Sequence, residues 1–279
     1  MQPTFIGIGA QKCASTWIYD ILWDHPDVVL SETKEIDFFS FHYDHGLQWY
    51  LNHFKERPGA RAIGEISPSY FHEPAVPGRM KRHCPDAKIL VSLRDPVQRA
   101  ISNHRHEIRV KHFTGTDLSF EAGLANNPMY IEQGLYATHL SRWLEHFPAS
   151  QMLIVLFDEV VADPADVAKR IYRFLGLEED HCSQAVDKQS NPGHINRYPK
   201  LEAFRNKLYQ LAKGARMDRL WQTGGRLGLR EIYRRVNKLP PETVIPPIPE
   251  HVLQTLRTQF AEEVIELEKI LGRSLSQWR

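Results

Sequence analysis

The sequence predicts an α/β fold, with three layers (α/β/α) around a central, mainly parallel sheet. Apolar runs rich in β-branched residues recur at 4–9, 61–66, 87–93 and 151–157. Segments with helical spacing lie between them, at 15–25, 74–84, 96–111 and 136–147. Such alternation is typical of βαβ units. Continuous apolar runs such as KILVSL also favour strands that are covered on both faces.

Capping residues support the expected helices. Asp95-Pro96 and Asp163-Pro164 each offer an N-cap followed by proline at the first helical position. The second of these helices is expected to end near Leu175-Gly176. A last helix is predicted from apolar residues at helical intervals, namely Val252, Leu256, Phe260, Val264, Leu267 and Leu271.

Composition describes an ordinary globular chain of 279 residues, with 42% hydrophobic and 25% charged residues. We expect a single domain over 1–279, with a core at 3–200 and a basic helical extension at 200–279. The net charge of +1 gives no argument for nucleic acid as a partner. Three scattered cysteines favour a reducing compartment, and no leader is evident, so we expect a cytoplasmic protein.

The opening segment FIGIGAQKCASTW contains a strand, a tight turn with a lysine and the start of a helix. It fails the dinucleotide fingerprint, because Lys12 stands where the last glycine belongs. It also lacks the Ser/Thr that holds magnesium in a Walker loop, because Cys13 follows the lysine. What remains is a P-loop-like turn whose helix N-terminus and Lys12 favour an anion. The plain alternative is a strand–helix corner with a solvated lysine.

A second anion site is indicated by LRDPVQRAIS at the end of the third predicted strand. Arg94 stands at the carboxyl edge, where open α/β sheets bind ligands. Ser102 follows about two turns into the next helix. A guanidinium and a hydroxyl together suit a phosphate, although an arginine before Asp-Pro is often only a capping partner.

With these motifs, the sequence resembles the sulfotransferases that use 3′-phosphoadenosine 5′-phosphosulfate (PAPS), especially the domains that modify heparan sulfate. QKCASTW is similar to the family's 5′-phosphosulfate loop, and LRDPVQRAIS to its 3′-phosphate motif. The likeness extends, in order, to the segments ETKEIDFFSFHYDHGLQWYLNHF, EISPSYF, GLYATHLSRWL and SLSQW. It implies a PAPS donor, adenosine 3′,5′-bisphosphate (PAP) as product, and no metal.

The resemblance also implies roles for individual residues. Glu35 falls on the proposed catalytic base, and His106 on a histidine near the acceptor in one branch. The residues matched to donor binding are Lys12, Cys13, Ala14, Ser15, Thr16, Trp17, Arg94, Ser102 and Tyr136. The late loop that closes over the nucleotide is not recognisable, and Asn196 and Arg197 are candidates for it. A lysine that the family often carries on the acceptor side is replaced by Ile66.

The residues themselves leave alternatives open. Glu35 also reads as a surface carboxylate beside Lys34, and His106 as part of a solvated basic helix face or as the base in place of Glu35. His42 and His45 have the spacing of a metal pair, but no cysteine or third ligand accompanies them. The rival functions are a P-loop kinase that uses ATP and magnesium, and a nucleotide-binding scaffold without catalysis.

The expected acceptor is a carbohydrate hydroxyl, an amine or another small-molecule alcohol. The aromatic segment FFSFHYDHGLQWY suits a sugar face, although core packing explains part of it. Residues 200–238 carry 11 Lys or Arg against 3 Asp or Glu, a net charge of +8. This basic amphipathic segment suits peripheral contact with an anionic membrane or acceptor, or a docked helix with a solvated face. Acceptor identity, regiochemistry and oligomeric state stay open.

Overall fold

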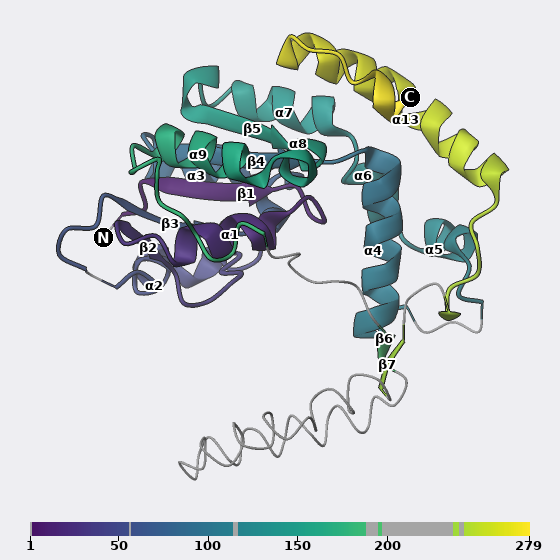
Figure 1. The fold of residues 1–279 in the computed structure, drawn as a ribbon, viewed down its shortest axis with the longest axis horizontal. Coiled ribbons are helices and arrows are strands. Elements are labelled where there is room, and N and C mark those ends of the chain that lie inside the picture. The colour runs from purple at the N-terminus through teal and green to yellow at the C-terminus, as the bar shows by residue number, and fades with distance from the viewer. Residues whose placement is uncertain (1, 56, 114–116, 188–194, 197–236, 240–242) are drawn as a thin grey trace. The chain divides into compact units, whose positions relative to one another are not determined.

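A computed structural model describes residues 2–55, 57–113, 117–187, 195–196, 237–239 and 243–279 (Figure 1). The chain divides into two compact units. The first comprises Met1–Asn103, Asn127–Asn191 and Glu250–Arg279. The second comprises His104–Asn126 and Pro192–Pro249. The single-domain organisation therefore stays a prediction, and each unit is described by itself.

The first unit is built on a five-stranded sheet in the order β2-β3-β1-β4-β5, and every pair is parallel. The strands are β1 (Phe5–Gly9), β2 (Val28–Leu30), β3 (Ala62–Ile66), β4 (Lys88–Leu93) and β5 (Met152–Leu156). The predicted parallel sheet is thus confirmed, and β2 is an additional edge strand. Chain connections leave β1 and β4 in opposite directions, so the topological switch point lies between these two strands.

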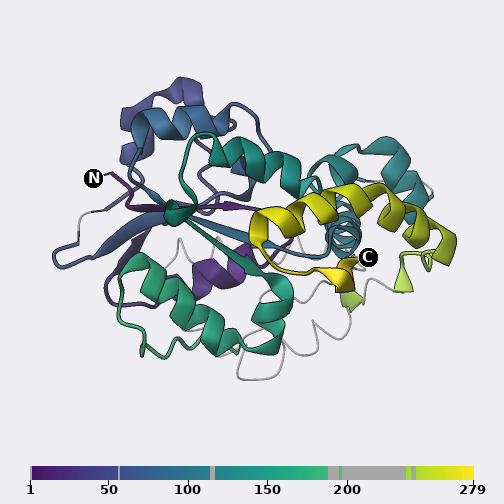
Figure 2. The same cartoon turned by 90° about the horizontal axis from the view of Figure 1, so that it is seen from above.

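Helices cover both faces of this sheet. Figure 2 shows α1 (Ser15–Trp23) and α9 (Pro164–Leu175) on one side of the strands, and α3 (Val76–His83) and α7 (Tyr136–Leu144) on the other. The three-layer prediction is therefore confirmed. The remaining elements of this unit are η1 (Tyr43–His45), α2 (Leu47–Leu51), η2 (Pro68–Tyr70), α6 (Met129–Glu132), η3 (Ala149–Gln151), α8 (Phe157–Ala162), α13 (Glu250–Leu271) and η5 (Ser276–Trp278).

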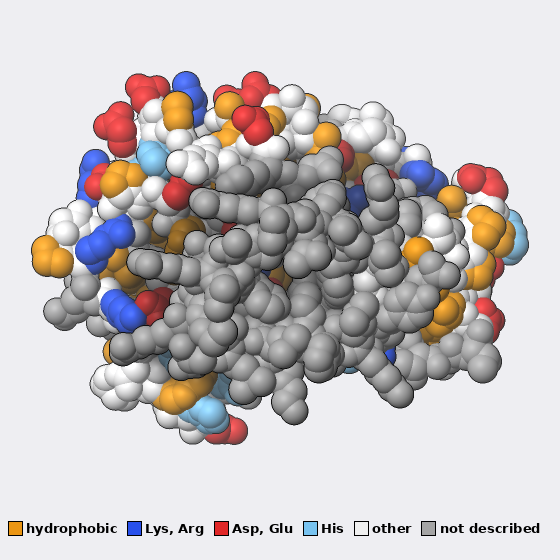
Figure 3. Space-filling model, turned by 60° about the horizontal axis from the view of Figure 1, so that its bottom comes forward, with side chains coloured by type: hydrophobic (Ala, Val, Ile, Leu, Met, Phe, Trp, Pro, Cys, Tyr) orange, Lys and Arg blue, Asp and Glu red, His pale blue; other side chains and the backbone are white. Residues whose placement is uncertain are grey.

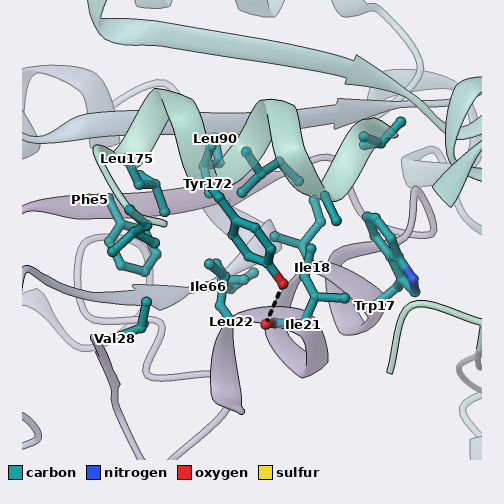
Figure 4. Close-up of a cluster of buried hydrophobic side chains, with 14 of the residues drawn as sticks. Phe5, Trp17, Ile18, Ile21, Leu22, Val28, Ile66, Leu90, Tyr172 and Leu175 are labelled. Atoms are coloured by element: carbon teal, nitrogen blue, oxygen red, sulfur yellow. Dashed lines mark hydrogen bonds between the residues drawn. The ribbon is translucent and has the colours of Figure 1, made fainter. Parts of the chain in front are cut away.

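The face toward α1 and α9 holds a continuous apolar core (Figure 4). Ile21 and Leu22 of α1 and Tyr172 of α9 are fully buried against side chains of the sheet. The Tyr172 hydroxyl donates to the Ile21 carbonyl at 3.0 Å, so the one polar atom of this buried ring is satisfied. This packing fixes α1, and with it the turn that precedes α1.

The opposite face is closed by α7 and the C-terminal helix. Trp143 of α7 is fully buried and donates from its indole to the Phe71 carbonyl at 3.0 Å. Glu263 of α13 accepts from the backbone N–H of Ala137 (2.9 Å) and of Thr138 (3.1 Å) at the start of α7. A carboxylate at a helix start complements its free N–H groups and its dipole. The end of the predicted extension therefore packs on the core.

The predicted caps are confirmed. Asp95 Oδ1 accepts from the N–H groups of Val97 (2.8 Å) and Gln98 (3.2 Å) at the start of α4 (Pro96–Val110). Asp163 Oδ1 accepts from Asp166 N at 2.9 Å, and α9 ends at Gly176 in the left-handed conformation. Helix α4 begins in the first unit and ends in the second.

The second unit contains the end of α4, α5 (Phe120–Asn126) and the short antiparallel pair β6 (Ile195–Asn196) and β7 (Lys238–Leu239). Most of the basic segment 200–238 lies outside the described residues. In the described part of the chain, no helix is both long and apolar enough to cross a bilayer. On the face drawn in Figure 3, acidic, basic and apolar side chains of described residues are interspersed.

Candidate active site

The turn after β1 has a specific backbone shape. Gly9 has φ +134°, and a Cβ there would meet the Pro68 carbonyl oxygen at 2.8 Å, so only glycine fits. Ala10 N then donates to the Ser92 carbonyl at 2.8 Å, which holds the turn against the end of β4. Lys12 (φ 68°) and Ala14 (φ 76°) are left-handed, whereas the intervening residue is not. Alternation of this kind is typical of anion-binding backbone nests.

Helix α1 leads out of this turn without a side-chain cap hydrogen bond at Ala14. Its first N–H groups and its positive dipole end therefore point into the turn that carries Lys12. Ser15 and Thr16 supply partly exposed hydroxyls on the first turn of the helix. Trp17 is buried in the core and donates from its indole to the Val186 carbonyl at 3.0 Å. The Trp17 side chain is therefore not available to an anion, and only its backbone N–H could contribute to binding.

Arg94 lies at the carboxyl end of β4. Its guanidinium stacks over the Phe157 ring, 4.4 Å from the centroid, and its side chain is partly exposed. The capping role belongs to Asp95, which is occupied by backbone N–H groups of α4. Ser102 lies on α4 and is also partly exposed. Arg94 is thus held by an aromatic ring at the sheet edge and presents a cation there.

The two predicted phosphate motifs meet at Cys13. Its thiol is fully buried, 3.7 Å from the Tyr136 hydroxyl at the start of α7. Burial raises the pKa of the Cys13 thiol to about 11, although Tyr136, the Arg99 and Arg94 charges and a backbone hydrogen bond from Arg94 act in the other direction. The structure therefore brings the Lys12 turn, Arg94 and Tyr136 to one place, beside the switch point between β1 and β4.

Glu35 lies in the segment after β2, next to Lys34. Lys34 Nζ is 3.5 Å from Glu35 Oε1 and 3.5 Å from Thr16 Oγ1, so this lysine joins the segment to the start of α1. Burial raises the pKa of the Glu35 carboxyl, Lys34 lowers it, Asp37 raises it and Lys12 lowers it, with a net upward shift. About a third of the Glu35 side chain stays exposed (34%). Glu35 is therefore an accessible carboxylate within the field of Lys12.

A buried polar network contacts the backbone of residues 37–39, and the sequence did not predict it. Glu65, at the end of β3, is fully buried and accepts from Ser67 Oγ (2.6 Å) and from the Tyr70 hydroxyl (2.8 Å). Burial raises the pKa of Glu65 to about 7. The sequence also did not predict the contact of Lys34 with Thr16. A charged residue inside the apolar strand RAIGEI is the sequence signal that would have indicated Glu65.

Two predicted residues belong to the second unit, and a third is not described. His106 Nδ1 lies 2.8 Å from Arg109 Nη2 on α4. Asn196 is in β6, where it pairs with Lys238, and Arg197 lies outside the described residues. The structure therefore does not test whether these three meet the site of the first unit.

The paired histidines lie in the aromatic segment after Glu35. The rings of His42 and His45 are 5.4 Å apart between centroids, and both side chains are exposed. Within the described ranges, no three His, Cys, Asp or Glu residues are grouped so as to hold a metal ion.

A family model for the sulfotransferase domain matches residues 2–209. The chain belongs to the sulfotransferase family. It is 36% identical over 182 residues to human heparan sulfate glucosamine 3-O-sulfotransferase 3B1, which is 63% of this chain and 46% of that protein. It is 30% identical over 211 residues to human bifunctional heparan sulfate N-deacetylase/N-sulfotransferase 3, which is 68% of this chain and 24% of that protein.

This sulfotransferase-family chain thus spans less than half the length of those two relatives. Its fold is also similar to the crystal structure of a sulfotransferase from Alicyclobacillus acidocaldarius, with a TM-score of 0.70 and 26% identity. That match covers 100% of this chain and 99% of the other. The predicted family is confirmed, and the expected likeness to heparan sulfate sulfotransferases is found in these two relatives.

Proposed function

We propose that this chain transfers the sulfuryl group of PAPS to a hydroxyl or amine of a carbohydrate or other small-molecule acceptor. One observation carries the proposal. The turn of Lys12 and the cation Arg94 meet through Cys13 at neighbouring strand ends, and Glu35 lies within the field of Lys12. Two cationic positions and a carboxylate in one place suit a doubly phosphorylated donor and an acceptor that must lose a proton.

The residues present fit the donor. The backbone nest at residues 12–14, the uncapped start of α1 and Lys12 would hold the 5′-phosphosulfate. Arg94 and Ser102 would hold the 3′-phosphate, and Tyr136 borders the same place through Cys13. The donor supplies an activated sulfuryl group. The task of the protein is then to align the reactants and to stabilise charge on the leaving phosphate oxygen.

Glu35 is our candidate for the base that removes the acceptor proton. Its pKa is raised by burial, which brings a carboxylate closer to the working pH of a general base. His106 is less suited. The Arg109 guanidinium can only donate, so Nδ1 of a neutral His106 accepts and Nε2 carries the proton. That ring nitrogen is then a donor rather than a base.

A carbohydrate acceptor is supported by the relatives, whose names specify heparan sulfate, and by the aromatic segment after Glu35. Phe38, Phe39 and Tyr50 are fully buried and belong to the core. The Phe41 ring is 66% exposed, and Trp49 is partly exposed. Aromatic rings at such positions are suited to the face of a sugar.

A nucleotide kinase is the rival enzyme. The residue after Lys12 would have to present a hydroxyl to magnesium, but Cys13 directs a buried thiol toward Tyr136. Calorimetry with PAP and with ATP–magnesium tests this point. We expect binding of PAP and much weaker binding of ATP, and the reverse order would refute the donor assignment.

Turnover tests the reaction. Labelled PAPS should give labelled product with at least one acceptor from a panel of heparan-type oligosaccharides, other sugars, amines and simple alcohols, detected by mass spectrometry. Tight PAP binding with no transfer to any acceptor would favour the scaffold without catalysis.

A further inference from the structure

The buried Glu65 carboxylate is connected to the segment that carries Glu35. Ser67 Oγ donates to Glu65 Oε2. Ser67 Oγ also accepts from the backbone N–H of Asp37 at 3.0 Å. The Tyr70 hydroxyl donates to Glu65 Oε1 and accepts from the backbone N–H of Phe39 at 3.3 Å. Each hydroxyl therefore links Glu65 to a backbone amide two or four residues beyond Glu35.

The direction of these hydrogen bonds suits the ionised carboxylate. A carboxylate only accepts, so both hydroxyl protons point at Glu65 and both hydroxyl oxygens remain open to the amides. Protonation of Glu65 removes the charge from both hydrogen bonds, and charge-assisted hydrogen bonds are about twice as strong as neutral ones. Uptake of one proton at Glu65 therefore weakens both links to segment 37–39.

We propose that Glu65 is a positioning residue, which acts through Ser67 and Tyr70 to hold Glu35 in place for proton removal when the Glu65 carboxylate is ionised. The inference rests on the proposed function, because it takes Glu35 as the base.

The groups around Glu65 bring its titration into the neutral range. Burial raises its pKa to about 7, and Asp37 adds to the increase while the hydroxyls oppose it. The Tyr50 hydroxyl of α2 also lies close to Glu65, and its pKa is raised by burial and by the Glu65 charge. Cys84, after α3, has its own pKa raised by burial and by Glu65.

One permanent cation, Arg79 of α3, also holds the segment. Its Nη1 donates to the Phe39 carbonyl at 2.6 Å, whereas the Tyr70 link is to the Phe39 N–H. This contact does not involve Glu65, so the expected change when Glu65 takes up a proton is a local shift of residues 35–39 rather than unfolding.

Backbone amide shifts of Asp37 and Phe39, from ¹⁵N-labelled protein, test the links without any turnover. Both amides should titrate with a shared midpoint near pH 7 in the wild type, and neither should do so in Glu65→Gln. Tyr70→Phe keeps the ring and removes one link, so the Phe39 amide should stop titrating while the Asp37 amide continues. Wild-type amides that do not titrate, or a Glu65→Gln protein in which they still do, would overturn the proposal.

A matched control separates positioning from general support. Ser69 Oγ donates to Asp37 Oδ1 at 2.5 Å and so holds the same segment without touching Glu65. Ser69→Ala should leave both amide midpoints near pH 7. A control protein that loses the titration as completely as Glu65→Gln would mean that any loosening of the segment has this effect, and would refute a specific role for Glu65.

The pH profile of kcat tests the consequence for transfer. The wild-type profile should rise through pH 7, whereas Glu65→Gln should lack that limb. In Glu65→Gln, kcat should be lower by about 10- to 100-fold, because a small misplacement of a catalytic group costs this much, while KM for PAPS stays unchanged. An unchanged profile would refute the proposal. Wild-type protein that transfers nothing would instead refute the proposed function, and the amide titration would still decide whether Glu65 holds the segment.

Discussion

The donor side and the acceptor side of the site are held by different means. On the donor side, residues 9–14 are fixed by backbone geometry: a glycine at φ +134°, two left-handed residues and a hydrogen bond to the end of β4. On the acceptor side, segment 35–40 lies outside every helix and strand and is fixed by side chains, namely Ser67, Tyr70 and Arg79.

The difference has a physical basis. A phosphate is a constant anion, so backbone N–H groups and permanent cations suit it at every working pH. The acceptor must give up a proton, so its side of the site needs groups that titrate. Glu35 and Glu65, both with raised pKa values, lie on that side. Substitutions on the two sides should therefore affect different steps.

The largest effect is expected from Glu35→Gln. It should reduce kcat by about 10²–10⁴-fold with little change in PAP affinity, because it removes a positioned base and no donor contact. In the wild type, transfer should fall as the pH drops through the raised pKa of Glu35, since only the ionised carboxylate accepts a proton. Turnover that survives Glu35→Gln but is lost in His106→Ala would exchange the two assignments.

Lys12→Ala should lower transfer by about 10²–10³-fold, the usual cost of removing one stabiliser of transition-state charge. Because Lys12 also lowers the pKa of Glu35, the acid limb should move upward, which links the two sides. Circular dichroism should show an intact fold. The matched control is Lys169→Ala, which removes an exposed lysine of α9 and should leave transfer unchanged.

Glu65 should make the protein less stable as the pH rises. Its folded pKa of about 7 lies above the ordinary 4.5, so its contribution is fully present below pH 4.5 and is lost as the pH rises through 7. Relative to Glu65→Gln, the wild type should lose about 3 kcal/mol of unfolding free energy across this window. Urea unfolding at pH 5 and pH 8.5 measures the difference, and a constant gap between the two proteins would contradict it.

Arg94→Ala should weaken PAP binding by about 10- to 100-fold, the cost of one charged hydrogen-bonding contact, and should affect kcat much less. Arg94→Lys keeps the charge but loses the flat guanidinium that stacks on Phe157, so its affinity should lie between the two. Calorimetry with PAP measures both variants. Equal affinity in all three proteins would remove Arg94 from the donor side.

Asp163→Ala sets the lower end of the scale. It removes the N-cap of α9, which makes none of the contacts described on either side, and should cost about 1 kcal/mol of stability without changing transfer at 25 °C. Thermal unfolding and a standard turnover assay are sufficient. A loss of transfer in this variant would mean that activity follows global stability. The variants of the donor and acceptor sides could then not be assigned to different steps.

The donor side could be predicted from the sequence because its determinants are local. The strand–turn–helix of residues 5–23 and the cap at Asp95 are determined by residues that are neighbours in the sequence. The structure has both at the predicted positions. Strand β2 was missed because three residues, Val28–Leu30, carry no pattern of their own and become a strand only by pairing with β3.

The acceptor side was predicted only in part, because its contacts are distant in sequence. Glu35 was recognised from its surrounding motif. The contact of Lys34 with Thr16 joins positions 18 residues apart, and the link from Ser67 to Asp37 spans 30 residues. Such pairs are set by how β3 and the segment after β2 pack together, which no local pattern contains. The second unit and the residues outside the described ranges leave His106, Asn196 and Arg197 as predictions.

The burial of Cys13 has a practical consequence for labelling. Cys13 and Cys84 are buried, with pKa values raised to about 11 and about 12, so few thiolates form at either position near neutral pH. Cys182 is exposed. A maleimide dye should therefore attach at Cys182 alone, and this family member provides a single reporter position without any engineered cysteine.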